Sequence, residues 1–171
     1  MTEKHQAEVR LQERLEFEEL LNSLSARLAS VTRTEKLDDV ITQAVEQTCR
    51  FLGVERGLVF QFSSDRQFIL CTHEWHVPHV PSAISRLACQ SGRRYPWVTK
   101  SIVDHGTLVA NSVAEIPEDV HRERELLLEH DVTSLVAITM NAGGETLGFI
   151  RFDSIGVQRS WSSDFVARLR M

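Results

Sequence analysis

The sequence lacks the features that would cross-link it, anchor it in a membrane or attach it to nucleic acid. It has three cysteines and no CxxC pair, which predicts reduced thiols rather than a disulfide framework. Its longest apolar runs, such as residues 68–71, span four residues and are too short for a transmembrane helix. Lys and Arg number 19 against 24 Asp and Glu, and the net charge of −5 argues against nucleic-acid binding.

What the chain does contain fits one globular domain with a helical extension. A length of 171 residues is within the size of a single domain. A chain of this size buries roughly 70% of its unfolded surface and needs no disulfides. The first residues are polar and lack the apolar core of a signal peptide. We therefore expect a cytoplasmic location and no direct membrane contact, with any membrane tether supplied by other parts of a parent protein.

Residues 1–31 are expected to form a helix that links domains. Residues 3–31 contain no glycine or proline and are rich in Glu, Leu, Arg and Ala. Five apolar residues recur there with the seam spacing of a coiled coil, namely Phe17, Leu21, Leu24, Leu28 and Val31. Upstream, Leu11 and Leu15 form a shifted stripe. Two interpretations stay open: a dimer helix, or an amphipathic helix packed on its own domain.

Residues 32–171 alternate between helical and strand periodicity. Thr32 and Glu35 have the spacing of a capping box, and two glycines within residues 142–145 predict a hairpin. The predicted helices cover 32–52, 97–105, 117–130 and 163–171, and the predicted strands cover 58–62, 68–75, 108–110, 134–141 and 146–153. This order predicts an α+β fold, an antiparallel sheet of five to six strands flanked by helices.

Several short segments resemble the GAF domain family in their order and spacing. Residues 52–56 lead into residues 60–62 as at the entry to the first GAF strand, and residues 73–75 resemble the end of the second. The other matching positions are Pro96-Trp97, Gly106, residues 114–117, residues 147–150 and residues 160–162. The resemblance covers about residues 32–171 and implies a GAF-like (PAS/profilin-like) fold whose C-terminal helix is cut short.

Residues 1–8 resemble the linker that follows a PAS domain in bacterial sensor proteins. Together the two resemblances imply a PAS-GAF sensor whose output domain is a histidine kinase of a two-component system or, alternatively, a GGDEF diguanylate cyclase. The chain itself would be a regulatory module without catalytic activity. It would form a homodimer through its N- and C-terminal helices, which would relay a signal between covalently linked PAS and output domains.

The resemblance also implies where a ligand would bind. In GAF domains the ligand cavity lies between the central sheet and the loop and helices that follow the second strand. This placement predicts a small-molecule pocket with apolar walls. Its candidate residues are Phe60, Phe62, Trp75, Leu87, Tyr95, Trp97, Leu135 and Ala137. The alternative is a packed core without a ligand, and the corresponding function is that of a structural dimerisation spacer.

Three other kinds of site have weaker support. His73, His76 and His79 are close in sequence, but an extended strand points His73 and His76 to opposite faces, so no metal site is expected. Cys89 is the cysteine expected to be exposed, which leaves GAF-type free methionine sulfoxide reductase as an alternative activity. The family's cyclic-nucleotide signature and a cysteine–histidine pair for bilin attachment are not evident, so no cofactor is expected.

Overall fold

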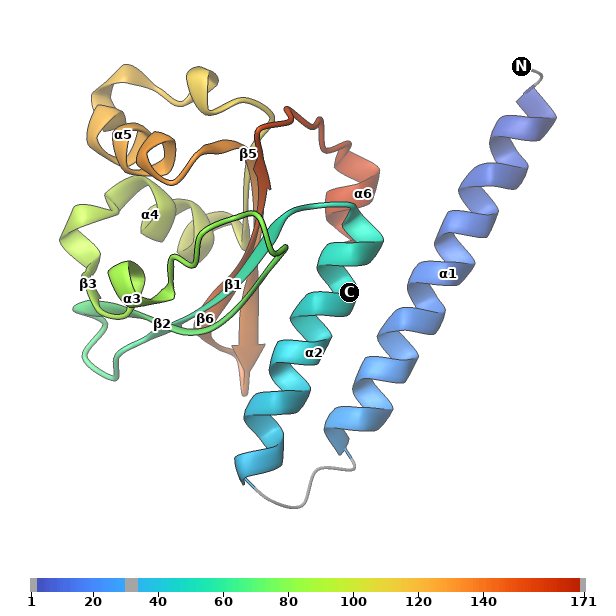
Figure 1. The fold of residues 1–171 in the computed structure, drawn as a ribbon, viewed down its shortest axis with the longest axis horizontal. Coiled ribbons are helices and arrows are strands. Elements are labelled where there is room, and N and C mark those ends of the chain that lie inside the picture. The colour runs from blue at the N-terminus through green and yellow to red at the C-terminus, as the bar shows by residue number, and fades with distance from the viewer. Residues whose placement is uncertain (1–2, 30–33, 170–171) are drawn as a thin grey trace.

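The computed structural model describes residues 3–29 and 34–169. At its centre is a six-stranded antiparallel sheet in the order β3-β2-β1-β6-β5-β4 (Figure 1). The strands are β1 (Arg56–Phe62), β2 (Phe68–His76), β3 (Gln90–Ser91), β4 (Thr107–Ala110), β5 (Val132–Ala142) and β6 (Glu145–Ile155). This architecture, with a long N-terminal helix, confirms the predicted α+β, GAF-like fold.

Helices cover both faces of the sheet, as Figure 1 shows. On one face lie α3 (Ile84–Leu87), α4 (Pro96–His105) and α5 (His121–Glu129), with the short 3-10 turns η1 (Gly92–Arg94), η2 (Val113–Glu115) and η3 (Glu118–Val120) around them. On the other face lie α1 (Glu3–Ala29), α2 (Thr34–Leu52) and α6 (Ser163–Leu169). Within the described residues, no helix is both long and apolar enough to cross a membrane.

Strand alternation divides the core into two clusters. In β6, Phe149 packs among the buried residues beneath α3–α5, whereas Phe152 packs with those beneath α2. Residues at odd and even positions of a strand point to opposite faces, so one strand supplies both clusters. We call these two sides of the sheet the α3–α5 face and the α2 face.

Helix α2 packs directly on the backbone of β1 at Gly57. A Cβ atom at this position would lie 2.5 Å from Val45 Cγ1 and 2.6 Å from Cys49 Sγ, closer than such atoms can approach. Glycine is therefore required for this helix–sheet contact. Through this contact α2 packs closely on β1, a central strand of the sheet.

Helix α1 packs on the same domain through part of its predicted seam. Phe17 is buried, and its ring centroid lies 5.4 Å from that of Phe51 at the end of α2. An apolar partner within its own chain covers Phe17, which fits the interpretation of a helix packed on its own domain, and the dimer seam stays a prediction. The side chains of Leu21, Leu24 and Leu28, and the whole of Val31, lie outside the described residues.

Three details of the predicted elements differ from the structure. The first strand begins at Arg56 rather than residue 58, because a buried ion pair neutralises that charge within the sheet. The short edge strand β3, between the second strand and α4, was not predicted. The predicted helix 117–130 starts as a 3-10 turn and becomes α-helical at His121, because Pro117 is extended, with ψ of 144°.

Candidate functional site

The α3–α5 face brings together seven of the eight predicted pocket residues. Phe60, Leu87, Leu135 and Ala137 are buried there, and Phe62, Tyr95 and Trp97 are half-buried and packed against them. The Phe60 and Phe149 rings stack with centroids 4.7 Å apart. Seven residues predicted to lie together are therefore packed in one cluster on this face.

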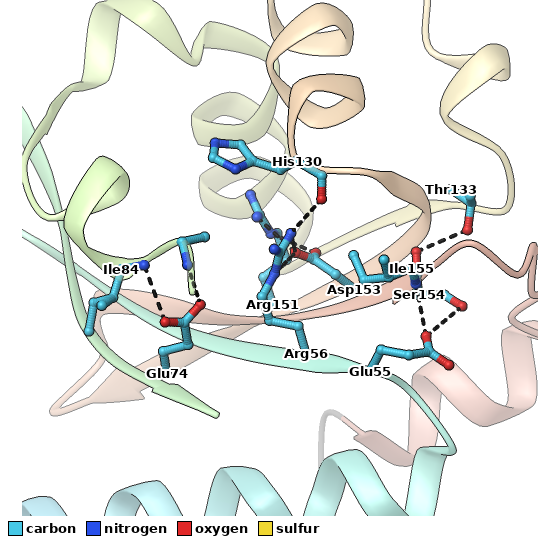
Figure 2. A network of polar contacts seen from close by, with 11 residues as sticks. Glu55, Arg56, Glu74, Ile84, His130, Thr133, Arg151, Asp153, Ser154 and Ile155 are labelled. Atoms are coloured by element: carbon cyan, nitrogen blue, oxygen red, sulfur yellow. Dashed lines mark hydrogen bonds and ion pairs between the residues drawn. The ribbon is translucent and has the colours of Figure 1, made fainter. Parts of the chain in front are cut away.

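Trp75 lies on the opposite side of the sheet, with the cluster beneath α2. Its ring lies 5.3 Å from the Arg50 guanidinium carbon of that helix. The reason is a β-bulge: Val59 pairs with His73 and Phe60 with Cys71, which leaves Thr72 as an extra residue. A bulge reverses the alternation of side chains, so Trp75 turns to the α2 face. The same reversal points Glu74 toward α3 (Figure 2).

A buried ionic cluster lies on the α3–α5 face (Figure 2). Arg56 of β1 and Arg151 of β6 both contact Asp153, and these residues are 2%, 5% and 0% exposed. Asp153 Oδ2 accepts hydrogen bonds from Arg56 Nη2 at 2.9 Å and from Arg151 Nη2 at 2.9 Å. Arg151 Nε lies 2.8 Å from Asp153 Oδ1. Two guanidinium groups thus share one carboxylate, and the cluster carries an excess positive charge.

The cluster also contacts the aromatic residues of this face. The Arg151 guanidinium carbon lies 5.3 Å from the Phe60 ring centroid, within the range of a cation–π contact. Tyr95 is close enough for Arg151 to act on its phenol, but burial is the larger effect and raises the Tyr95 pKa. A phenol, two guanidiniums and stacked aromatic rings are therefore grouped beneath the helices.

Helix α3 is held at its N-terminus by a side chain from the sheet. The Glu74 carboxylate accepts hydrogen bonds from the backbone N–H of Ala83 at 2.8 Å and of Ile84 at 3.2 Å. A carboxylate at this end satisfies free donors and matches the positive end of the helix dipole. Helix α3 is thereby tied to β2, across a gap of nine residues in sequence.

Two further charged side chains hold α4 and α5. The Glu123 carboxylate, buried in α5, accepts hydrogen bonds from the N–H groups of Trp97 at 2.9 Å and Val98 at 3.1 Å at the start of α4. Burial raises the Glu123 pKa, and these two bonds oppose the increase. Arg56 Nη2 donates to the His130 carbonyl at 3.2 Å, at the negative end of α5. We call Glu74, Glu123 and Arg56 the helix clamps.

The cysteines occupy three different environments. Cys71 lies within the α3–α5 face, where burial raises its pKa to about 12. Cys49 belongs to α2 and points toward the sheet, and burial raises its pKa further. Cys89 is exposed, as the sequence predicted. A thiol with a raised pKa is a weak nucleophile at neutral pH, so neither buried cysteine is activated for chemistry.

The histidines do not assemble into a metal site. His73 Nε2 lies 3.2 Å from Asp38 Oδ1 of α2, whereas His76 Nδ1 lies 3.0 Å from the neighbouring Val77 carbonyl. Among the residues that the structure describes, no three His, Cys, Asp or Glu side chains group as metal ligands would. His130, next to Arg56, has a pKa lowered by burial and by the nearby arginines.

Three cavities stand out among the described residues, and none lies between the sheet and α3–α5. One of about 900 Å³ lies between α1, the end of α2 and the start of α6. Another of about 440 Å³ lies between the β1–β2 turn, η1 and α4. The third, of about 350 Å³, lies between α1, α2 and the sheet. On the α3–α5 face, Leu87, Val98, Ile102 and Leu135 are each at most 5% exposed, so side chains pack closely between the helices and the sheet.

Sequence reasoning missed the charged residues of the site. Arg151 and Asp153 alternate within an otherwise apolar strand, which is a signal that they share one buried face. Their partner Arg56 stands just outside the predicted first strand. Glu123 gave no such signal, because a glutamate in a helix is ordinarily a surface residue.

No curated protein matches the chain in sequence. Among solved structures, the phycocyanobilin-bound GAF domain from a cyanobacterial phytochrome is 18% identical with a TM-score of 0.73, over 90% of this chain and 87% of that one. The Thermosynechococcus elongatus PixJ GAF domain is 13% identical, with a TM-score of 0.63, over 81% and 82%. The chromophore-binding domain of Stigmatella aurantiaca phytochrome P1 is 12% identical, with a TM-score of 0.67, over 90% and 56%.

These identities are low, and the likenesses therefore establish a shared fold. The family model described as GAF domain matches residues 36–171, which is most of the chain and includes both faces of the sheet. The predicted resemblance is thus confirmed at the level of sequence as well as fold. The chain belongs to the GAF domain family.

Proposed function

We propose that this chain is a sensory module that binds a small anionic molecule on the α3–α5 face and relays binding to α1 and α6. The observation that carries the proposal is the pair Arg56 and Arg151, both buried and both paired with the single carboxylate of Asp153. A buried charge without a full partner is costly, and an anionic ligand would supply the missing negative charge. Guanidinium groups are also the side chains best suited to bind carboxylate or phosphate in a fork.

A ligand would reach this cluster by displacing the helices above it. Each helix clamp consists of one or two hydrogen bonds at a helix end, and α3 spans only four residues. Hydrogen bonds to charged groups contribute about 1.5–3 kcal/mol each. Opening the Arg56 clamp, which is a single bond, is therefore within the differential binding energy of a few kcal/mol that drives a conformational change.

Several structural neighbours bind bilins, among them the phycocyanobilin-bound GAF domain from a cyanobacterial phytochrome. The closed α3–α5 face of this chain does not fit such a group. Leu87, Val98, Ile102 and Leu135 fill the space over the sheet, each at most 5% exposed. Cys71, the thiol within this face, has a pKa raised to about 12 and is a poor nucleophile for covalent attachment. We therefore propose a ligand smaller than a tetrapyrrole.

The relay to α6 would start at Asp153, which is followed directly by Ser154. The Ser154 hydroxyl bonds to Glu55 Oε2 at 3.2 Å and accepts from Arg159 Nε at 3.2 Å. Arg159 belongs to the segment that leads into α6, and its backbone N–H donates to Ser134 Oγ at 2.9 Å. A shift of β6 at the ionic cluster would thus change how the segment before α6 is held.

The module would act within a longer signalling protein, with α1 and α6 continuing into neighbouring domains. Its output domain, a histidine kinase or alternatively a diguanylate cyclase, stays a prediction from the sequence. Insertion of Gly-Gly-Ser near Ala29 in the intact parent would uncouple output from signal, because a helix that transmits movement must be continuous. Unchanged regulation after this insertion would contradict the helical relay.

The binding site is tested by thermal unfolding of the chain with a panel of small anions: succinate, glutamate, AMP and cyclic GMP, with biliverdin as the large alternative. A ligand at about a hundred times its dissociation constant adds about 2.7 kcal/mol. For a domain of this size that raises the Tm by about 5–10 °C. Arg151→Met should abolish the increase, whereas Arg122→Met, at an exposed position of α5, should retain it.

Three results would contradict the proposal. A Tm increase that survives Arg151→Met places the ligand elsewhere. A larger response to biliverdin than to the small anions overturns the ligand class. No response to any member of the panel favours the alternative function, a dimerisation spacer without a ligand.

A further inference from the structure

A basic groove lies on the outer side of α4, away from the ionic cluster. It has a volume of about 440 Å³ and runs between the β1–β2 turn, η1 and α4. The side chains used in the argument are Arg66, Phe68, Arg93, Lys100, Val103 and Asp104. Its walls are fixed by backbone bonds, since the Gly92 N–H donates to the Gln67 carbonyl at 2.8 Å and β3 pairs with β2. We call this feature the basic groove.

The groove is positive in a chain that is negative as a whole. Arg66, Arg93 and Lys100 face a single acid, Asp104, whereas the chain carries a net charge of −5. Across residues 3–29 and 34–169, none of these three cations takes part in an ion pair. The Arg66 guanidinium carbon lies 6.0 Å from the Phe62 ring centroid, a weak cation–π contact that leaves its charge without an acidic partner, so the three charges are available to an anionic partner.

Arg66 occupies a backbone conformation that favours glycine. Its φ is 56°, in the left-handed region, where a side chain costs strain. The turn holds it there, because the Arg66 N–H donates to the Ser63 carbonyl at 2.8 Å and Asp65 Oδ1 accepts from the Gln67 N–H at 3.0 Å. Strain at a non-glycine position is a reason to seek a function for that side chain.

Apolar and unpaired polar atoms complete the groove. Phe68 is 42% and Val103 48% exposed, both beside the cations. The Thr99 hydroxyl, also in the lining, is buried and has no hydrogen-bond partner among the described residues. A surface with cations around exposed apolar side chains matches an acidic peptide that carries an apolar residue.

We propose that the basic groove docks an acidic segment of a partner protein, with carboxylates on Arg66, Arg93 and Lys100 and an apolar side chain on Phe68 and Val103. The charge complementarity favours an acidic protein segment, since the negative charge of the rest of the chain would repel the long phosphate backbone of a nucleic acid. This docking is independent of a ligand on the α3–α5 face.

The test uses the full chain and fluorescence anisotropy. The probe is a labelled peptide of Glu and Asp with one central Phe, and its matched control replaces the acids by Gln and Asn. Arg93→Glu with Lys100→Glu should weaken binding of the acidic peptide about tenfold or more. Lys36→Glu with Arg122→Glu makes the same change in net charge outside the groove and should leave binding within about twofold. Circular dichroism confirms folding, and the corresponding Gln variants replace any Glu variant that does not fold.

Arg66→Gly provides a second readout. It should weaken peptide binding, because a cation is lost, and it should raise the Tm, because glycine relieves the left-handed backbone. A merely structural arginine would not show these opposite changes. Weaker binding together with a lower Tm would contradict the assignment of Arg66.

Four results would overturn the proposal. Equal losses in the two double variants would indicate long-range attraction, and equal binding of the neutral peptide would indicate apolar contact alone. Binding of inorganic phosphate without binding of the peptide would indicate a small-anion site. Tighter binding of a single-stranded oligonucleotide than of the peptide would indicate the wrong class of partner.

Discussion

Asp153 is the residue whose replacement should cost the most stability, because it balances two buried cations. Its carboxylate lies 2.9 Å from Nη2 of both Arg56 and Arg151, and 2.8 Å from Arg151 Nε. Asp153→Asn keeps the shape and removes the negative charge. Removing one partner of a buried ion pair costs about 3–5 kcal/mol, since the remaining charge is left without compensation.

Arg151→Met provides the decisive comparison. It removes one of the two cations, leaves Asp153 paired with Arg56, and replaces a buried charge by an apolar side chain. Asp153 then balances one buried cation instead of two and no buried charge is left without compensation, so we expect a cost of about 1 kcal/mol, well below that of Asp153→Asn. The two variants alter the same cluster, and their difference therefore measures the charge imbalance rather than a loss of packing.

Urea unfolding at neutral pH measures both variants, with Asp39→Asn as a control at an exposed position of α2. In thermal unfolding, Asp153→Asn should lower the Tm by about 6–20 °C, since each kcal/mol corresponds to about 2–4 °C in a domain of this size. A cost below about 1 kcal/mol for Asp153→Asn would refute the reasoning. An equal cost for Arg151→Met would refute it as well, because the cluster would then act by packing.

The remaining predictions concern a helix–sheet contact, the N-terminal helix and a buried acid. Gly57→Ala should destabilise the fold by about 1–3 kcal/mol in urea unfolding, since its Cβ would lie 2.5 Å from Val45 Cγ1; an unchanged midpoint would contradict this. We predict self-association through the exposed Leu11 and Leu15, so Leu11→Glu with Leu15→Glu should give monomers in light scattering where the wild type gives dimers; wild-type monomers would contradict it. Burial raises the Glu123 pKa above its usual 4.5, so the folded state binds a proton more readily than the unfolded state, and this contribution to stability is lost as pH rises through the folded value. As pH rises through that range, the unfolding free energy of the wild type should therefore fall relative to that of Glu123→Gln. A difference between the two proteins that stays constant with pH would contradict the effect.

The elements that depend on local periodicity could be predicted from the sequence. The features that depend on pairing between distant strands could not. The glycines within residues 142–145 predicted the β5–β6 hairpin, and the structure has it. Trp75 was assigned to the pocket from the family resemblance, whereas the bulge at Thr72, which is set by pairing with β1, turns it to the α2 face.

The charged residues of the site illustrate the same limit. Arg56 and Asp153 are 97 residues apart in sequence, and only the β1–β6 register makes them partners. Glu123 likewise reaches Val98 across 25 residues. A local pattern contains no information on such pairs, so their burial could not be inferred from the sequence alone.

The position of the ionic cluster on β1 and β6 explains how a small ligand could influence helices on the other side of the sheet. Arg56 and Gly57 are neighbours in β1, and the second of them has α2 packed on its backbone. Asp153 in β6 is flanked by Phe152, which packs beneath α2, and by Ser154, which contacts the segment before α6. A close-packed sheet has little free volume to absorb a change on one face. A ligand that alters the pairing of Arg56 and Asp153 would thus act on the sheet contacts of α2 and of the segment before α6. The sheet itself would be the coupling element.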